Sequence, residues 1–429
     1  MPRKLNKFIF LAAAATAFAQ NPPLTLQQAV ETALRNHPQV AAAENQVNYA
    51  RQQITENRAA YYPTLTGEIT GSQANNLSRI GAGELTASRL FNREADGVLL
   101  SQLITDFGRT HNLVASARLQ QQSAEQNLNA TRYDVILAVN RAFYGVLNAQ
   151  AVVKVAQETI AARQQLDEQV SQLAKSGLKS QLDVSFADVQ VSQARLLLLR
   201  AQDAVAAAQA QLGRTLGSDQ PTGAALAEQQ LPPSPPANAD ALVTEALNNR
   251  PEVASLRFAS ESAYKFFEAE KDLTRPTVTA AGAAGAIPYI QNTSSTPIPV
   301  GYEGIGANVS VPIFNGHLFA ARREAARQKA FEADQNLRNQ QEIISRDVRV
   351  AYSSAIDAYQ RIDVTAQFLR QAAMALDLAN GRYSNGLASI VELTQAQLNL
   401  TEAEIENVGA KYDYQTQYSV LQYAIGALR

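Results

Sequence analysis

Residue types that usually perform chemistry are few in this chain and lie far apart. The 429 residues include no Cys and 3 His, at His37, His111 and His317. Without Cys, the sequence excludes a disulfide framework, a thiolate nucleophile, a Cys-based zinc site and a lipidated N-terminal Cys. The His residues lie near expected element boundaries, which favours capping or surface roles over a shared metal site.

Motifs of the common catalytic and nucleotide-binding sites are missing as well. The chain has no G-x-x-x-x-G-K-[ST], H-E-x-x-H, G-x-S-x-G or G-x-G-x-x-G segment. Acidic residues cluster at Glu402, Glu404 and Glu406, but this spacing indicates a solvated helix face or a tunnel lining. An enzyme with a helical insertion is therefore disfavoured, because no catalytic set converges. We expect no cofactor and no bound metal.

The charge balance excludes a further class of protein. The chain has 37 Lys and Arg against 39 Asp and Glu, and 46% of its residues are hydrophobic. A nucleic-acid-binding protein would concentrate basic residues on one face. A disordered chain would be less apolar. The composition therefore predicts a folded protein without a nucleic-acid partner.

Residues 1–19 have the pattern of an export signal. Basic residues up to Lys7 precede an apolar run from Phe8 to Ala15, and Ala17-Phe18-Ala19 fits an A-x-A cleavage site. We expect this signal peptide to be removed and the mature protein to leave the cytoplasm. The following residues contain no uncharged apolar run of the length of a transmembrane helix, although membrane strands would escape that test.

The rest of the chain consists of two similar halves. Ala33–Val40 returns as Ala246–Val253, and Pro63–Thr66 returns as Pro276–Thr279. The Pro-rich run Leu231–Pro236 between the halves cannot be helical and indicates an extended linker. We therefore expect a first structural repeat at 20–217, a linker at 218–239 and a second structural repeat at 240–429.

Each half contains a very long helix. Ile344, Val348 and Tyr352 form an apolar stripe close to the 3.5-residue repeat of a coiled coil, and Val135, Val139 and Phe143 repeat it in the first half. The helix from about 318 to 384 would be roughly 100 Å long at 1.5 Å per residue. Gly177 and Gly386 end these helices, and further helices follow at about 182–216 and 390–425. Each half therefore ends in a long helical hairpin that needs neighbours along its length.

Alternation with period two predicts a pair of strands in each half. Apolar residues alternate with Gly or polar residues from Gly304 to Ile313 and around Leu65 and Ile69. Segments 95–104 and 277–288 are the weaker partners. These lengths match the roughly 9–11 residues of a tilted membrane strand. Aromatic residues flank the strands, with Tyr61, Tyr62, Phe107 and Phe314 on the helix side and Phe91, Tyr289 and Tyr302 on the loop side.

Two interpretations of these aromatic residues remain open, because two belts are typical of a membrane barrel and the rings could also simply pack the strand–helix junctions. Four strands cannot close a barrel, and open edges are not tolerated in lipid. Two copies would supply eight strands and three would supply twelve. A symmetric ring of copies would close the sheet and also surround the long helices.

Several marks together resemble the TolC-like outer-membrane efflux protein family. An Asn-x-Pro-x-Val segment occurs at 36–40 and again at 249–253. Val311–Gly316 at the strand-to-helix passage has a degenerate partner in Leu103–Arg109, and both hairpins have a Gly-Leu tip. The order of these marks, duplicated after a cleavable signal, makes the resemblance specific over residues 24–426.

The resemblance implies a mainly α-helical fold with a β-barrel part and duplicated halves. It implies a homotrimer, in which each chain adds four strands to a twelve-stranded outer-membrane barrel and long hairpins to a periplasmic α-barrel. Such a channel exports small toxic compounds, drugs or proteins and performs no chemistry itself. Its implied partners are a periplasmic adaptor and an inner-membrane pump of the RND, ABC or MFS type, in a Gram-negative-type bacterium.

An alternative function is a periplasmic coiled-coil adaptor or scaffold without a pore. The strand pairs with two aromatic belts argue against it, as does the two-fold repeat. Cell fractionation separates the two functions, because an adaptor would dissolve without detergent.

The resemblance also assigns a role to the two hairpin tips. Ser176-Gly177-Leu178 and Asn385-Gly386-Leu387 resemble the family's Val-Gly-Leu type of adaptor-contact motif, with Ser and Asn where Val is typical. Each Gly also suits an ordinary helix cap, and the two roles are compatible.

Four residues near the tips are implied to form and gate the periplasmic entrance. Glu392 matches an acidic position that narrows the entrance, where three like charges would attract cations; a solvated helix acid is the alternative. The family's second acid is Gln395 here. Tyr383 and Asp183 match a network that holds the entrance shut, and the Arg of that network is Ala388 here. We therefore expect Tyr383–Asp183 contacts across adjacent hairpins, and a latch that either differs from the family's or is weaker.

Overall fold

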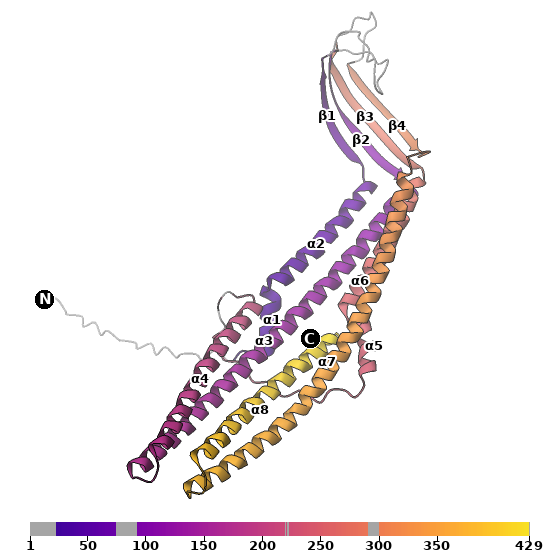
Figure 1. Ribbon diagram of the computed structural model, residues 1–429. Helices are drawn as coiled ribbons and strands as arrows, with labels where there is room; N and C mark the ends of the chain where they lie inside the picture. Colours follow the sequence, from indigo (N-terminus) through magenta and orange to yellow (C-terminus); the bar gives the residue numbers. More distant parts are fainter. Residues whose placement is uncertain (1–22, 74–91, 219, 221–222, 291–299, 429) are drawn as a thin grey trace, which may run out of the picture. The chain divides into compact units, whose positions relative to one another are not determined.

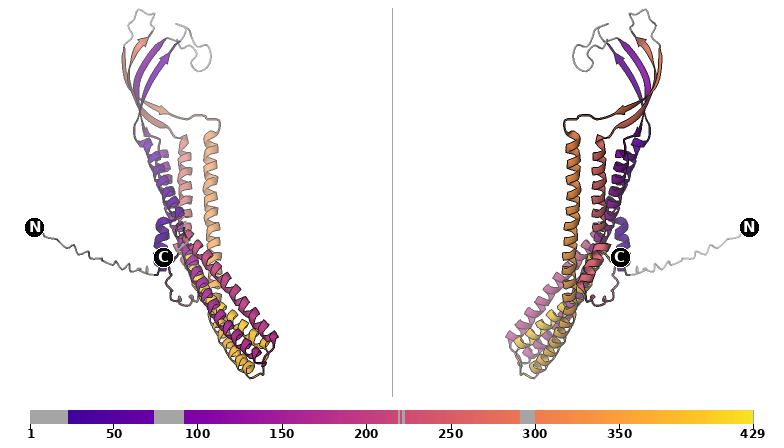
Figure 2. Two further views of the ribbon diagram at one scale, coloured as in Figure 1. Left: turned by 90° about the vertical axis from the view of Figure 1, so that its left-hand side faces the viewer. Right: turned by 90° about the vertical axis from the view of Figure 1, so that its right-hand side faces the viewer.

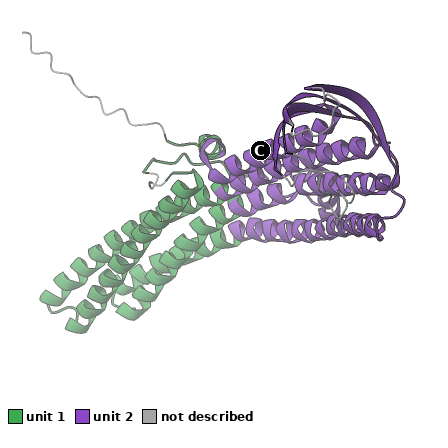
Figure 3. Ribbon diagram, turned by 90° about the horizontal axis from the view of Figure 1, so that it is seen from above, with its two compact units in different colours: residues 1–33, 139–232, 364–415 green, residues 34–138, 233–363, 416–429 purple. Residues whose placement is uncertain are grey.

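A computed structural model of the protein describes residues 23–73, 92–218, 220, 223–290 and 300–428. The expected signal peptide and Phe91 lie outside the described residues. The chain forms two compact units (Figure 3). Unit 1 comprises Met1–Ala33, Val139–Pro232 and Val364–Gln415, and unit 2 comprises Leu34–Ala138, Pro233–Asp363 and Thr416–Arg429. Each unit therefore contains parts of both expected repeats.

Long helices and one short sheet make up the described chain, and the order of elements repeats (Figure 1). The first series is α1 (Leu26–Asn36), α2 (Pro38–Arg58), β1 (Thr64–Ser72), β2 (Arg93–Thr105), α3 (Arg109–Lys175) and α4 (Gln181–Thr215). The second series is α5 (Ala239–Asn249), α6 (Pro251–Lys271), β3 (Thr277–Ile290), β4 (Gly301–Ser310), α7 (Leu318–Ser384) and α8 (Ile390–Ala424). Short 3₁₀ helices at Ala59–Tyr61 and Asp272–Thr274 precede β1 and β3. The predicted duplication of helices and strands is confirmed.

The four strands of unit 2 lie side by side in one curved antiparallel sheet (Figures 1 and 2). Their order is β1-β2-β3-β4, so β2 and β3 join the two halves of the chain. Thr64 pairs with Ser101, Leu99 with Ala283, and Thr277 with Ser310. Within the described residues, β1 and β4 each pair on one side only, and each therefore presents an edge.

The register sorts the strand side chains into two different faces, because residues directly opposite in an antiparallel pair share a face. One face is mainly apolar and the other is mainly polar or small. The apolar face carries Leu65, Ile69, Val98, Leu100, Val278, Ala280, Ala284, Ile305, Ala307 and Val309, with Asp96, Gln102 and Glu303 toward its ends. The other face carries Thr64, Thr66, Glu68, Thr70, Ser101, Thr279, Tyr302, Asn308 and Ser310, with Leu99 and several Gly and Ala.

The passage from strand to long helix is a sharp turn in both halves. Phe107 has φ 55° and Gly108 has φ 113° before α3, and Gly316 has φ 62° and His317 has φ 69° before α7. These consecutive left-handed residues redirect the chain into the long helix that follows. The predicted strand through Ile313 is therefore too long, since β4 ends at Ser310 and Pro312 offers no N–H to a ladder.

A buried carboxylate connects the helices of unit 2 near these turns. Glu270 on α6 is only 2% exposed and pairs with Arg322 of α7 at 2.8 Å and with Arg109 of α3 at 3.7 Å. Asp272 accepts a hydrogen bond from Asn112 at 3.0 Å and pairs with Arg275 at 3.1 Å. Removing one partner of such a group would leave a buried charge uncompensated, so these contacts fix the helix ends beside the sheet.

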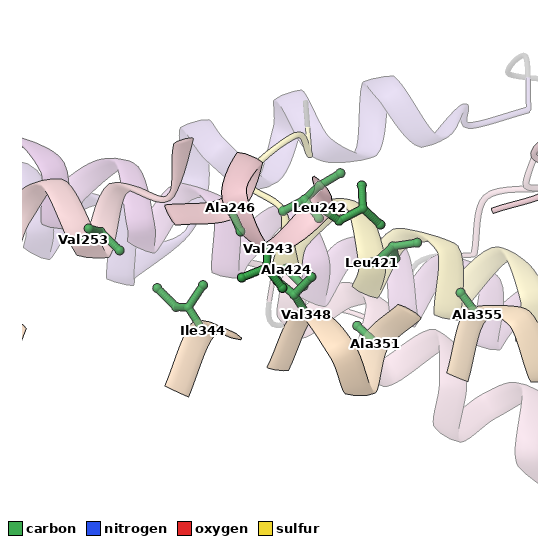
Figure 4. Close-up of a cluster of buried hydrophobic side chains, with 11 residues drawn as sticks. Leu242, Val243, Ala246, Val253, Ile344, Val348, Ala351, Ala355, Leu421 and Ala424 are labelled. Atoms are coloured by element: carbon green, nitrogen blue, oxygen red, sulfur yellow. The ribbon is translucent and has the colours of Figure 1, made fainter. Parts of the chain in front are cut away.

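The apolar stripe predicted for the long helices forms the cores. In unit 2, Ile344 and Val348 of α7 pack with residues of α5, α6 and α8 (Figure 4). In unit 1, Leu166 and Val170 of α3 pack with residues of α4, α7 and α8, including Tyr383. The stripe therefore joins the four long helices, as the coiled-coil spacing predicts.

One helix among the described residues, α3, contains an 18-residue stretch apolar enough to cross a membrane by length and composition. Of that stretch, 61% is buried inside the chain. A core helix of a soluble protein meets the same criterion, so this feature is weak support for a transmembrane helix.

Candidate functional site

The tips of the two helical hairpins lie at the same end of unit 1 and have the same geometry (Figure 1). At the first tip, Gly177 has φ 76° and the N–H of Leu178 donates to the carbonyl of Leu173 at 2.9 Å. At the second, Gly386 has φ 74° and the N–H of Leu387 donates to the carbonyl of Arg382 at 2.8 Å. Both are Schellman caps, which require the left-handed residue that Gly supplies.

Each tip presents a bare apolar side chain. Leu178 and Leu387 are both 71% exposed. The polar residues before each Gly bond to their own helix, since Ser176 Oγ donates to the carbonyl of Gln172 and Asn385 Nδ2 donates to the carbonyl of Gly381. The hydroxyl and amide donors are therefore used internally, and the leucines are the groups that a partner would meet first.

The two predicted entrance acids occupy equivalent positions at the start of the following helices. Asp183 belongs to a capping box, in which its carboxylate accepts from the N–H of Ser180 at 3.0 Å and from Ser180 Oγ at 2.9 Å. Glu392 stands at the same place in α8, and its N–H donates to Ser389 Oγ at 3.2 Å. Both acids therefore stabilise a helix N-terminus, whatever further role they have.

Glu392 has a cationic partner within its own hairpin. Arg382, on α7 just before the tip, places Nε 3.2 Å from Glu392 Oε1 and donates from Nη2 to the carbonyl of Leu387 at 3.2 Å. Both side chains are about half exposed. Arg382 therefore connects the two sides of the second tip. It also neutralises Glu392, which the sequence predicts to carry an unpaired charge at the entrance.

Tyr383 is the buried centre of the site. Its side chain is 6% exposed and belongs to the apolar cluster of unit 1. Burial, and to a smaller extent the negative charge of Asp183, raise the pKa of its phenol above the ordinary value. Lys179, from the turn between α3 and α4, lies with Nζ 3.9 Å from the centre of the Tyr383 ring. The first tip thus contacts the second hairpin through a cation and a ring.

Two further positions that the resemblance singles out, Gln395 and Ala388, contact a residue near them in the chain and the apolar cluster, respectively. Gln395 is exposed on α8 and donates to Asn399 Oδ1 at 2.9 Å, one turn further along the helix. Ala388, where the family's Arg is expected, packs against the apolar cluster that contains Tyr383. No group of three or more metal-binding side chains is found among the described residues.

Sequence reasoning missed Lys179 and Arg382. Arg382 precedes Tyr383 directly, but only the hairpin geometry brings it across to Glu392. Lys179 follows the first tip, and nothing in its spacing points to a ring on another helix. The capping role of both acids could have been predicted from the sequence, because Ser180-x-x-Asp183 and Ser389-x-x-Glu392 both match the capping-box pattern.

Comparison with known proteins identifies the family. The family model described as "Outer membrane efflux protein" matches residues 29–218 and 242–427. The chain belongs to this family. The outer membrane protein TolC of Salmonella enteritidis is 24% identical over 422 residues, which cover 94% of this chain and 82% of that protein. The outer membrane efflux protein BepC of Brucella suis is 24% identical over 410 residues, with 94% and 86% covered.

Solved structures have the same fold. The crystal structure of CusC matches with a TM-score of 0.80 at 21% identity, over 94% of this chain and 92% of that one. The predicted family, fold class and outer-membrane location are confirmed, and the protein is an outer-membrane exit channel for efflux. Nothing in these matches supports the alternative of a periplasmic adaptor or scaffold.

Proposed function

We propose that this outer-membrane efflux protein works as a homotrimer in which three four-stranded sheets close one barrel. Two properties of the sheet support this proposal. β1 and β4 are edges in the described chain, and lipid does not tolerate open edges. The apolar face carries fully displayed side chains such as Ile69, 91% exposed, and Ile305, 93% exposed, which need a lipid surface to cover them. Three sheets supply twelve strands, enough to leave a pore.

The mature chain then starts after residue 19, with structural repeats at 20–217 and 240–429 joined by the linker at 218–239. The two separate matches to the family model support this division. The helical hairpins of three chains surround a periplasmic tunnel. In this arrangement the hairpin ends of unit 1 face the periplasm and form the entrance.

A periplasmic adaptor and an inner-membrane pump of the RND, ABC or MFS type deliver the exported compound. Relatives carry names such as "Cation efflux system protein" and "Toluene efflux pump outer membrane protein", which supports small toxic compounds as cargo, with drugs and proteins as further classes. The adaptor contacts Ser176-Gly177-Leu178 and Asn385-Gly386-Leu387. The exposed Leu178 and Leu387 support this assignment, because they place two equivalent apolar groups at the tips.

The entrance itself is formed by Glu392, Gln395, Asp183 and Tyr383. Glu392 and Gln395 are exposed and one turn apart on α8, so both can face a common passage. A role for Asp183 and Tyr383 is supported by the negative charge of Asp183, which contributes to raising the pKa of the Tyr383 phenol. Asp183→Ala is expected to change the single-channel conductance, and a conductance equal to the parent's would count against this role.

One experiment tests the trimer and the pore together. The protein is extracted from membranes in detergent, its mass is measured with the bound detergent subtracted, and it is added to a planar lipid bilayer. We expect three times the mass of the mature chain and discrete conductance steps. A monomer that dissolves without detergent and never conducts would overturn the proposed function.

A further inference from the structure

Lys179, which follows the tip of the first hairpin, contacts the ring of Tyr383 in the second hairpin. Lys179 comes from the turn between α3 and α4, and Tyr383 comes from α7. The 3.9 Å from Nζ to the ring centre is well inside the range in which a cation is attracted to an aromatic face. A charge on one hairpin is thus held by a ring of the other.

The phenol hydroxyl does not provide this connection. Tyr383 Oη is buried and has no hydrogen-bond partner among the described residues. Asp183, its expected partner, directs its carboxylate to the N–H and Oγ of Ser180. The face of the ring is therefore the part of Tyr383 that bonds to the first tip.

Other cations near the second tip are not available for this contact. Arg382 is paired with Glu392 and with the carbonyl of Leu387, and position 388 is an apolar Ala. Lys179 has no carboxylate within ion-pair distance in the part of the chain that the structure describes, so the ring is its partner. Beside the contact, α3 and the second hairpin line a cleft of about 860 Å³ whose walls include Gln169 and Tyr383. Tyr383 is thus both a wall of this cleft and the partner of Lys179.

We propose that Lys179 is a positioning residue of the periplasmic entrance, which holds the two hairpin ends of one chain together through the face of the Tyr383 ring. This proposal rests on the proposed function, since it takes these ends to be the entrance. It makes a distinction that a hydroxyl-based latch would not. A ring without its hydroxyl still attracts the Lys179 ammonium, whereas a long apolar side chain in place of Lys179 is not attracted to the ring.

The first test is single-channel conductance in planar bilayers. Lys179→Met is expected to raise the population of the open state by about 2-fold to 30-fold, which is the cation–π free energy converted to an equilibrium constant. Lys179→Arg is expected to behave as the parent, because it keeps a cation on the face of the ring. Lys175→Met, which removes an exposed positive charge just before the same tip, is the control for charge alone.

The second test needs no pore. Thermal midpoints are measured in detergent for Lys179→Met, Tyr383→Leu and the double variant. We expect coupling, so that Lys179→Met has little further effect on the midpoint once the ring is gone. We expect Tyr383→Phe to be at least as stable as the parent, because the hydroxyl that it removes is buried and has no hydrogen-bond partner among the described residues. The ring-face contact would be overturned if the two substitutions changed the thermal midpoint additively. It would also be overturned if Tyr383→Phe lowered the midpoint as much as Tyr383→Leu. A parent that never conducts would instead overturn the proposed function and leave a coupled pair without its gating role.

Discussion

At the scale of the residue, local bonds define what the two entrance acids can do. Asp183 is committed to its capping box, and Glu392 is paired with Arg382. An ion pair between half-exposed side chains contributes little to stability, about 0–1 kcal/mol. It does change the local field, because in the proposed trimer three Glu392 side chains with three Arg382 partners carry no net charge. The effect of Arg382 should therefore appear in ion selectivity and hardly at all in folding.

Arg382→Gln is expected to make the proposed channel more cation-selective. The change frees the charge of Glu392, and three free carboxylates around one passage attract cations. The free energy of unfolding should change by less than about 1 kcal/mol. Reversal potentials under a salt gradient measure the selectivity, and Arg370→Gln on the same helix is the matched control. Equal selectivity in the two variants would exclude the pairing of Arg382 with Glu392 in the assembled channel.

Glu404 on α8 predicts a dependence of stability on pH. Burial, and then the charge of Glu158, raise the pKa of Glu404 above its ordinary value of 4.5. When folding raises the pKa of a carboxyl, the protonated group stabilises the folded state. This contribution is complete only at pH values below the pKa of the unfolded state. This stability is lost as the pH rises through the folded pKa, so the cost of the charged form is complete at neutral pH.

Glu404→Gln is accordingly expected to stabilise the protein at pH 7 by up to about 1 kcal/mol, and to have no effect below about pH 4. Unfolding in detergent at both pH values measures the difference. Glu402→Gln, in the same acidic run, is the comparison variant. If Glu404→Gln raised the free energy of unfolding equally at both pH values, the charge of Glu404 would not be the cause of the stabilisation.

At the scale of the element, the two strand-to-helix turns reach the same backbone shape with different residues. The first half uses Phe107 and Gly108, and the second uses Gly316 and His317, in two consecutive positions of positive φ. Each half thus has one Gly for two left-handed positions. Gly108, at φ 113°, lies where a side chain is rarely tolerated, and a Cβ there would lie 3.3 Å from Asp272 Oδ2.

Gly108→Ala is expected to destabilise unit 2 by about 1–3 kcal/mol through backbone strain at the start of α3. The matched substitution is Gly145→Ala, in the same helix, where an added Cβ meets nothing within 4 Å. That variant is expected to gain about 1 kcal/mol, because Ala favours a helix interior. Thermal melts of both variants check the opposite signs. A Gly108→Ala as stable as the parent would mean that the turn relaxes without cost.

At the scale of the whole molecule, the sheet register decides how the chain meets the membrane. Successive residues of every strand lie alternately on the apolar face and on the polar face. The same substitution therefore has different consequences on the two faces. Ile305→Lys places a charge in the middle of the apolar face and is expected to cost about 2–4 kcal/mol of insertion free energy. Asn308→Lys places the same charge on the opposite face and should leave the amount in the outer membrane unchanged. Quantification of both variants in membrane fractions measures this, and equal losses would contradict the assignment of faces.

The amino-acid sequence by itself determined the periodic elements and their duplication. The helix predicted at 318–384 is α7, and those at 182–216 and 390–425 are α4 and α8 within one residue, because apolar spacing and Gly caps are local signals. The strand pairs also followed from local alternation, although β4 stops at Ser310, since Pro312 offers no N–H to the ladder. The family and the fold class came from the order of these local marks.

Only the tertiary structure decided the partners of the side chains at the hairpin ends. The sequence pointed to Glu392, Asp183 and Tyr383, but it did not place Arg382 beside Glu392 or Lys179 over the ring of Tyr383. These contacts join residues on different helices, whose rotation and stagger depend on how the apolar cluster packs around Leu166, Leu393 and Tyr383. Helical spacing fixes which residues share a face of one helix, whereas the meeting of two faces is set by the packing of all the side chains between them.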